Sequence, residues 1–510
     1  IQNEERFTNN DEHSDNDSNQ VILTMNWDQG DYTVTSVTGY IDYTSDEYID
    51  VDLTGVETLT FEQTEKFDQF SQEIRITSPG GETVDWIAGA YFQQWNLDYT
   101  QDNYIDDENL LSALSAIGIG SAAALGLPGF NPNAPMFTNA NPLLSQTYGV
   151  SAADIAASNI AGGGTAASGR ATNALQFVSM KELLNSNNHR EYESESTTYS
   201  IFGQATWNYS EELRFTLGAR YTAEDKEAER SVESFNTAGL TPVPANIFQQ
   251  TVTSRVFGID AHAVKDDRKE ESVTATAIVE WDVSLDAMVY ASISNGFKAG
   301  GFDARAGRAA DFEYEDETVI TYEIGGKAEL MDGRAQVNGA IFYTDYSDLQ
   351  VSQFDGNVGF IVGNAAKAKS RGVEIDGRMM LTEELMLLGS MAYLDYEFVD
   401  YDTGACDSST TLATGAVTCD RSGDAANYAP MWSGTVTLDY QKPVTDYMNL
   451  HVTLDASYRS EQTVEATFDS GLVQDSETDV NARIALEGDN WMLALVGKNL
   501  TDNDYIGYAS

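Results

Sequence analysis

The chain has 510 residues and a formal net charge of −53, with 81 Asp and Glu against 28 Lys and Arg. This charge argues against nucleic acid as a partner, because phosphate binding needs clustered Lys and Arg. The 26 Tyr, 21 Phe and 7 Trp argue against a disordered acidic chain. Two interpretations of the acidity stay open: solubility in a saline medium that screens self-repulsion, or a field that concentrates cations at the cell surface.

Two-residue alternation is the main pattern along the chain, and the first strand it predicts lies around residues 21–27. The clearest case is LRFTLGARYTA at 213–223, where apolar side chains fall on odd positions and polar residues or Gly on most even ones. Residues 452–458 repeat the pattern, and 335–343 follow it except at Phe342. A period of two is typical of strands with one apolar and one polar face.

Connection lengths then distinguish a membrane barrel from a soluble sandwich. Short turns are predicted at 28–31, 79–82, 208–212, 283–286, 331–334, 382–384, 442–446 and 488–490. Longer connections alternate with them, at approximately 44–66, 100–195, 228–268, 301–316, 353–367, 400–427 and 463–476. Outer-membrane barrels have this asymmetry of short periplasmic turns and long external loops, whereas sandwiches and propellers lack it.

The sequence therefore predicts an all-β, antiparallel transmembrane barrel wall with about sixteen strands, many long enough to cross a bilayer at a tilt. Five tryptophans lie within a few residues of a predicted short turn: Trp27, Trp86, Trp207, Trp281 and Trp491. We interpret them as a membrane-interface girdle, because an indole has an apolar body and one hydrogen-bond donor.

Residues 110–127 (LLSALSAIGIGSAAALGL) are 18 uncharged residues with the composition of a membrane helix. They contain Gly and Ser and lie inside the longest external connection, and a spanning helix would need a place beside a closed barrel. We expect a small apolar structure in an outer loop. It is either a helix that folds over the mouth or an Ala/Gly-rich loop without a ligand role.

Cys406 and Cys419 lie in the polar stretch CDSSTTLATGAVTC, which is typical of a disulfide formed outside the cytoplasm, with unrelated thiols as the alternative. The four histidines are scattered and none has ligand spacing to the cysteines, so no metal site is predicted. No catalytic constellation is found, so neither an enzyme activity nor a cofactor is expected. The segment GFKAGGF at 296–302 lacks the strand–helix context of a phosphate loop.

A series of segments resembles the barrel domain of TonB-dependent receptors in order and spacing. They are SNGFKAGGFDAR (294–305), ETVITYEIGGKAEL (317–330), AQVNGAIFYTDYSDLQVSQF (335–354), NAAKAKSRGVEIDG (364–377) and KNLTDNDY (498–505). Upstream, FSQEIRITSP (70–79) and the LRFTLGARYT hairpin are the better local matches.

The resemblance implies a barrel of 22 strands around a separate N-terminal plug, of which about sixteen strands are expected here. The strand at 21–27 would be the sixth and the strand at 490–504 the twenty-first. We expect residues 1–510 to be a partial barrel domain, without the signal peptide, plug, first strands and last strand. Such a fragment would expose two strand edges that lipid cannot satisfy, so an open or distorted sheet is expected.

The resemblance also implies active uptake across the outer membrane of a Gram-negative bacterium, energised by the TonB–ExbB–ExbD complex through the plug. A ferric siderophore is the expected ligand. Carbohydrate or cobalamin are alternatives within the family, and a passive porin or structural barrel is the alternative outside it. Outer-membrane lipid is the other expected partner.

Five loop residues are candidates for ligand contact. Phe302, Arg305 and Arg308 offer an aromatic ring and two cations to an anionic ferric chelate, and Phe354 and Phe360 could stack on a flat or apolar ligand. The alternative is that these residues only hold neighbouring loops together.

Overall fold

The computed structural model describes residues 12–50, 59–105, 186–236, 243–244, 259–354, 360–407, 410, 414, 416, 418–464 and 473–505. Within this part of the chain, sixteen long strands form one antiparallel sheet. They are β1 (His13–Asp28), β2 (Thr33–Asp50), β3 (Leu59–Thr77), β4 (Val84–Ile105), β5 (Ser186–Asn208), β6 (Leu213–Asn236), β8 (His262–Ser284), β9 (Ala287–Lys298), β12 (Glu317–Leu330), β13 (Ala335–Phe354), β14 (Phe360–Met380), β15 (Leu385–Asp400), β18 (Trp432–Thr445), β19 (Met448–Arg459), β22 (Glu477–Gly488) and β23 (Trp491–Gly497). The short elements are β7 (Val243–Pro244), β10 (Gly301–Phe302), β11 (Glu313–Tyr314), β16 (Gly404–Ala405), β17 (Thr418–Cys419), β20 (Gln462–Thr463), β21 (Val473–Gln474) and the 3-10 helix η1 (Ala309–Asp311).

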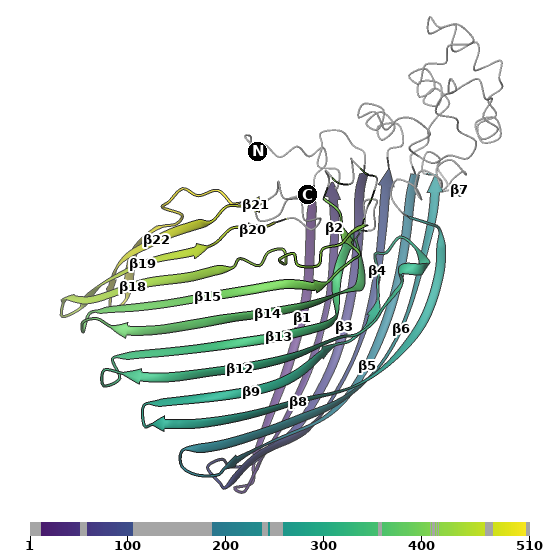
Figure 1. Ribbon diagram of the computed structural model, residues 1–510. Helices are drawn as coiled ribbons and strands as arrows, with labels where there is room; N and C mark the ends of the chain where they lie inside the picture. The colour runs from purple at the N-terminus through teal and green to yellow at the C-terminus, as the bar shows by residue number, and fades with distance from the viewer. Residues whose placement is uncertain are drawn as a thin grey trace, which may run out of the picture.

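Each long strand pairs with the next long strand along the chain, as in a simple meander. The short turns gather at one end of the strands and the long connections at the other (Figure 1). In the turn after β1, Gly30 has a φ of 82°, and the Asp28 carboxylate accepts its N–H at 2.8 Å. The predicted fold class, an antiparallel β-barrel wall, is confirmed.

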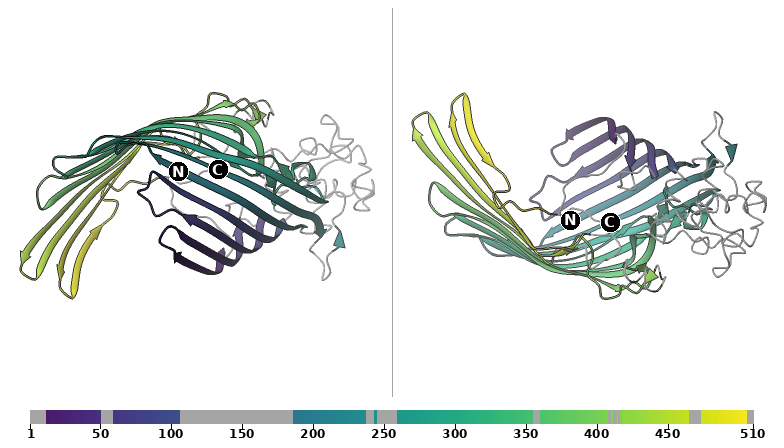
Figure 2. Two further views of the ribbon diagram at one scale, coloured as in Figure 1. Left: turned by 90° about the horizontal axis from the view of Figure 1, so that it is seen from below. Right: turned by 90° about the horizontal axis from the view of Figure 1, so that it is seen from above.

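The sheet is open between its first and last strands. Among the described residues, β1 has a strand partner only in β2, and β23 only in β22. Views along the wall show these two ends lying apart (Figure 2). Lipid cannot satisfy the N–H and C=O groups of a free edge, so each edge needs a partner in a membrane.

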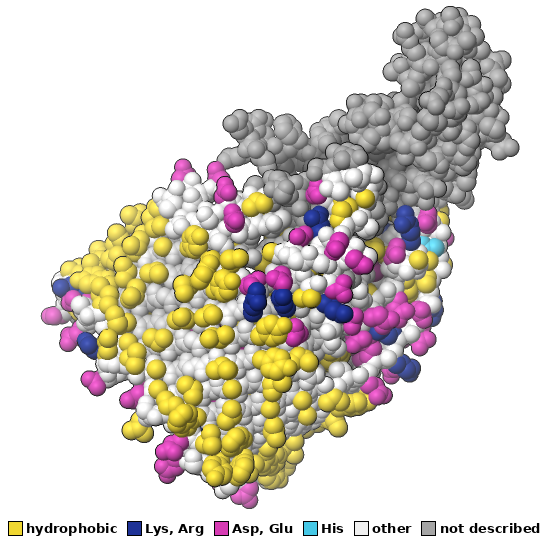
Figure 3. Space-filling model, viewed as in Figure 1, with side chains coloured by type: hydrophobic (Ala, Val, Ile, Leu, Met, Phe, Trp, Pro, Cys, Tyr) yellow, Lys and Arg dark blue, Asp and Glu magenta, His cyan; other side chains and the backbone are white. Residues whose placement is uncertain are grey.

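The two faces of the sheet differ as the alternation predicts. On β6, Leu217 is 66% exposed on the outward face, whereas its neighbour Thr216 is 5% exposed on the inner face. Hydrophobic side chains spread across the outward face of the strands, and carboxylates gather over the upper parts of β5, β6 and β8 (Figure 3). An apolar outward band is what a bilayer requires of a barrel wall.

The strands extend further toward the long connections than predicted. Residues 44–66, 100–195 and 228–268 were expected to be connections, but pairing continues to Asp50↔Thr60, Ile105↔Ser186 and Val232↔His262. The prediction was wrong because above the lipid level both faces of a strand can carry polar groups, so the alternation stops while the ladder continues.

Three other predicted boundaries also differ. The first strand begins at His13 rather than near residue 21, and only 355–359 separate β13 from β14 rather than 353–367. The last strand ends at Gly497 rather than near 504, because Asn499 and Asp502 adopt positive φ angles of 47° and 55°. The segment 110–127 lies outside the described residues. No helix in the described part of the chain is long and apolar enough to span a membrane.

Candidate ligand site on the inner wall

One external connection folds back onto the inner face of the wall. We call residues 299–316, between β9 and β12, the latch; it contains β10, η1 and β11. Its buried rings Phe302 and Phe312 stack at 4.9 Å between centroids and pack against wall residues of β4, β5 and β6: Tyr99, Tyr192 and Ala228. Each buried ring contributes on the order of 1.5–3 kcal/mol by leaving water, so the latch is a packed element.

Arg230 holds the latch from β6. Its guanidinium donates to the carbonyl oxygen of Asp303 and, at 2.6 Å, to that of Arg308. It also lies 4.9 Å from the ring centroid of Phe312. A single buried fork therefore binds two latch carbonyls, and that of Arg308 also accepts the Asp311 N–H at 3.2 Å.

Arg268 and Lys226 anchor the two ends of the latch. Arg268 pairs with Glu313 at 2.8 Å and also with Glu270 of its own strand. The Glu270 carboxylate in turn accepts the Gly300 N–H at 3.0 Å, and the Lys226 ammonium donates to the Gly300 carbonyl at 2.7 Å. A Cβ at residue 300 would stand 2.6 Å from Arg268 Cζ, so this close approach requires glycine.

Two buried arginines lie on the upper inner wall. Burial lowers the pKa of Arg190, and burial together with the nearby charge of Arg190 lowers the pKa of Arg230 to about 10. Both remain cations at neutral pH. Burial also lowers the pKa of His262, whose Nδ1 donates to the Asp260 carbonyl while its Nε2 accepts from Arg230 Nε at 3.2 Å. These contacts define a neutral imidazole.

The sequence-derived candidates fall in different environments. Phe302 is 6% exposed and belongs to the core under the latch, whereas Arg305 is exposed and Arg308 lies 3.6 Å from the carboxylate of Asp260. Phe354 and Phe360 are register partners at the tip of the β13–β14 hairpin; their side chains lie outside the described residues.

Asp303 is a functional candidate that the sequence did not single out. Its carboxylate accepts the N–H groups of Arg305 and Ala306 at 2.7 and 3.0 Å, and that of Val362 at 2.9 Å. An Asp whose side chain bonds the backbone two residues ahead is a recognised turn former. The bond from the Arg305 N–H could be predicted from the local sequence FDAR, whereas the bond from the Val362 N–H could not.

A second inward cluster packs below the cysteine loop. Leu349, Ala366, Ala368, Phe398 and Tyr401 form it on β13, β14, β15 and the following loop. Cys406 and Cys419, 13 residues apart in sequence, form a disulfide beside the β16–β17 pair.

The predicted girdle residues all lie beside short turns with exposed side chains: Trp27, Trp86, Trp207, Trp281 and Trp491.

The sequence did not predict a second outward belt of aromatic residues, which lies seven to nine residues along the strands from their ends at the short turns. It comprises Tyr40, Phe70, Phe92, Tyr199, Tyr221, Tyr322 and Tyr343, and its rings touch, as at Phe92–Tyr199, 5.2 Å apart. Tilted strands cover roughly 20–25 Å in that distance, which is close to the height of the apolar band of an outer-membrane barrel. The nearly constant distance of these aromatic residues from the short turns is the sequence signal that could have predicted this belt.

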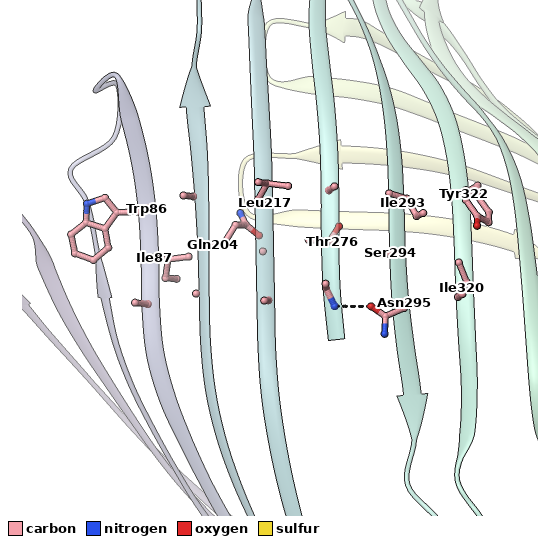
Figure 4. A pocket seen from close by; sticks show the side chains of 17 residues that line it. Trp86, Ile87, Gln204, Leu217, Thr276, Ile293, Ser294, Asn295, Ile320 and Tyr322 are labelled. Atoms are coloured by element: carbon pink, nitrogen blue, oxygen red, sulfur yellow. Dashed lines mark hydrogen bonds between the residues drawn. The ribbon is translucent and has the colours of Figure 1, made fainter. Parts of the chain in front are cut away.

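An apolar groove on the outward face is not a ligand site. It has a volume of about 690 Å³ and runs across β4, β5, β6, β8, β9 and β12 on the outward face, where small residues form one row: Ala88, Gly203, Ala219 and Ala275 (Figure 4). The side-chain amide of Asn295 on β9 accepts the Ala275 N–H at 2.8 Å and donates to the Val273 carbonyl at 3.0 Å. These backbone groups of β8 are open to it because β8 and β9 pair only as far as Thr276↔Ser294. The groove belongs to the apolar outward band, so its lining suits lipid acyl chains better than a polar ligand. No group of residues suited to a metal ion occurs in the described ranges.

A meander with an apolar outward band, two aromatic belts and an inward-folded external connection is the architecture of an outer-membrane barrel. The family model described as "TonB dependent receptor-like, beta-barrel" matches residues 2–500, and the chain belongs to the TonB-dependent receptor family. This is a family of transport receptors in the outer membrane of Gram-negative bacteria, not of enzymes.

Among curated proteins, the chain is 29% identical to the metal-pseudopaline receptor CntO of Pseudomonas aeruginosa over 128 residues, which are 25% of this chain and 17% of that receptor. The solved structures that share the fold include the ferric yersiniabactin uptake receptor FyuA of Yersinia pestis (TM-score 0.66, 13% identity, 98% of this chain and 58% of that one) and the siderophore receptor PiuA of Acinetobacter baumannii (TM-score 0.63, 16% identity, 98% and 62%). The chain thus covers less than two thirds of each of these relatives.

Proposed function

We propose that residues 1–510 form part of the barrel wall of a receptor that takes up a ferric siderophore by TonB-dependent transport. The observation that supports this is a group of four arginines on the latch and on the wall beneath it. Arg190, Arg230, Arg305 and Arg308 gather on one stretch of the inner wall in a chain of net charge −53. Of these four, only Arg308 lies within 4.0 Å of a carboxylate in the described part of the chain.

This arrangement suits an anionic iron chelate. Arg305 is exposed and held in place by the Asp303 turn, so its fork can donate two hydrogen bonds to a carboxylate or catecholate oxygen. Arg190 stands behind it in a less polar environment, where its charge is poorly screened by water. The guanidinium groups supply several hydrogen-bond donors to a negatively charged ligand.

In the proposed mechanism, the latch and neighbouring loops capture the ligand on the external side. The TonB–ExbB–ExbD complex then acts through a plug domain to open a path along the wall into the periplasm. The relatives named above are described as receptors for metal-pseudopaline, ferric yersiniabactin and siderophores, which supports this ligand class.

The test uses cells that carry the full-length receptor and a deletion strain, both starved of iron. Siderophores from spent medium of the iron-starved host are loaded with radioactive iron as the probe. Uptake should require the receptor and should stop when a protonophore collapses the proton gradient. Receptor-dependent uptake that persists without the gradient would identify a passive pore instead.

A second candidate, carbohydrate uptake, is favoured by a row of aromatic rings on the inner face of β2, β3 and β4. Tyr43 and Phe67 stack at 5.2 Å between centroids, and Trp95 follows at 6.1 Å. Carboxylate and amide groups lie alongside, with Tyr43 donating to Glu65 and Gln93 to Gln69. Receptor-dependent growth on an oligosaccharide, with no effect of deletion on iron uptake, would select this function over the first.

A further inference from the structure

The inner face of β6 carries four cationic side chains, and three of them have strong acceptors. Arg214 forks onto the Asp282 carboxylate, with 3.0 Å between Nη2 and Oδ1. Lys226 pairs with Glu224 at 3.2 Å, and Arg230 donates to latch carbonyls. The fourth, Arg220, donates only to hydroxyls within the described residues: to Ser200 at 2.8 Å and Thr222 at 3.3 Å.

The wall around Arg220 holds its guanidinium between two rings. Its Cζ lies 5.3 Å from the ring centroid of Tyr91 and 5.6 Å from that of Phe202. Phe202 can lie there because residue 89 is glycine: a Cβ on Gly89 would stand 2.5 Å from Phe202 Cζ. Aromatic faces attract the cation and orient its plane, but they leave its net charge uncompensated.

Arg220 faces the lumen on the path below the latch. It neighbours Tyr221 of the outer aromatic belt, whose ring points outward, so alternation turns Arg220 inward at the same height. Lys226, six residues further up the same face, holds the latch at Gly300. Two carboxylates of the same inner face are engaged with other cations, since Glu73 pairs with Arg75 at 2.8 Å and Glu224 with Lys226. The Nη1 group has no partner among the described residues and is free to donate.

We propose that Arg220 is an anion contact on the lumen wall, which takes a carboxylate or similar anionic oxygen group of the ligand after it leaves the latch. The inference rests on the proposed uptake function. An anionic oxygen accepts from the guanidinium more strongly than a hydroxyl does, so the ligand would gain a charge-assisted hydrogen bond at this position. The aromatic clamp keeps the fork in place without supplying a competing negative charge.

The test measures the local charge in the full-length receptor in intact cells. Thr274 of β8 is the cross-strand partner of Arg220, and a Thr274→Cys variant places a thiol beside it. The rates of labelling by an anionic (sulfonatoethyl) and a cationic (trimethylammonioethyl) methanethiosulfonate reagent are compared. Adding Arg220→Gln should lower the anionic-to-cationic rate ratio roughly fivefold, as expected for one charge a few ångströms away in a screened lumen, whereas Arg220→Lys should preserve it.

A Thr437→Cys variant on the distant strand β18 serves as the control, and its ratio should not respond to Arg220→Gln. Unchanged labelling at residue 437 also shows that the Arg220→Gln variant folds. The proposal is overturned if the ratio at residue 274 is the same with and without Arg220→Gln, or if neither reagent reaches residue 274. Because the reagents report charge without transport, this result and the uptake experiment fail independently.

Discussion

The carboxylate of Asp303 accepts a hydrogen bond from the backbone N–H of Val362, with 2.9 Å between Oδ2 and N. Since the other oxygen of Asp303 bonds the N–H of Arg305 at 2.7 Å, one buried side chain joins the latch to the start of β14. Two external connections that carry candidate ligand residues are therefore mechanically linked, and a ligand that moves Arg305 acts on both.

The Asp303→Asn variant should loosen this link. An amide presents only one acceptor oxygen and would turn an N–H₂ toward one of three N–H groups, at a cost of about 1–3 kcal/mol for the buried unsatisfied group. Hydrogen exchange followed by mass spectrometry should show faster exchange in 299–316 and 360–366 but not in β1–β3. Asp286→Asn, in an exposed short turn, is the control. Unchanged exchange at Val362 would contradict the linkage.

Arg230→Met should release the latch from β6. The substitution keeps apolar bulk but leaves the carbonyl of Asp303 without its side-chain donor, which costs about 1–3 kcal/mol for a buried acceptor. It also removes one of the two donors to the carbonyl of Arg308. Limited proteolysis should then cut within 299–316 well before the wall strands. The exposed Lys269→Met change should stay within about 0.5 kcal/mol of wild type. Equal protease resistance of the two variants would show that packing alone holds the latch.

The latch should lose stability in acid through His262. Its folded-state pKa is lowered by burial and by Arg230, so folding disfavours protonation. The stabilisation is therefore present above the unfolded pKa of about 6.5 and is lost as pH falls from there through the folded pKa. In His262→Gln, the amide can accept from Arg230 and donate to Asp260 at every pH. Latch exchange rates in wild type should rise below pH 6.5 relative to this variant; parallel pH profiles would refute the assignment.

Removing the disulfide with Cys406→Ser and Cys419→Ser should destabilise the loop that follows β15. A closed loop of this length contributes about 3 kcal/mol by chain entropy. Cleavage between residues 400 and 424 should accelerate in the double variant, and reduction of the wild-type protein should reproduce the effect. Wild-type protein that is insensitive to reduction would show that the cluster around Phe398 suffices.

The tryptophans near the short turns should be in contact with lipid, whereas Trp95 should not. Trp207 is 48% exposed on the outward face, while Trp95 packs on the inner face against Phe67. In variants that retain one tryptophan each, lipids brominated near the headgroup should quench the fluorescence of Trp207 strongly and that of Trp95 weakly. Equal quenching would mean that the assignment of inner and outer faces is wrong.

Much of the fold was accessible from local patterns. Alternation determines which side chains share a face, and the lengths of the connections show at which end of the sheet each turn lies. The meander and its outward face could therefore be predicted residue by residue around Leu217. The positions of the strand ends above the membrane could not be predicted from the sequence. There the pairing of β4 with β5 up to Ile105↔Ser186 depends on a distant strand and leaves no alternation in the sequence.

The site could be predicted only in part. The resemblance of 294–305 to the receptor family pointed to this loop, but Phe302 packs against the wall while Arg305 is exposed, and no local rule separates the two.

Local sequence patterns were enough to define an antiparallel membrane wall and its family, because lipid imposes a repeating apolar face on every strand. They could not show where charge is compensated, since that depends on contacts made in three dimensions. Whether Arg214, Arg220 or Arg230 finds an acceptor depends on β5, β8 and the latch, which the chain brings together from positions far apart in sequence.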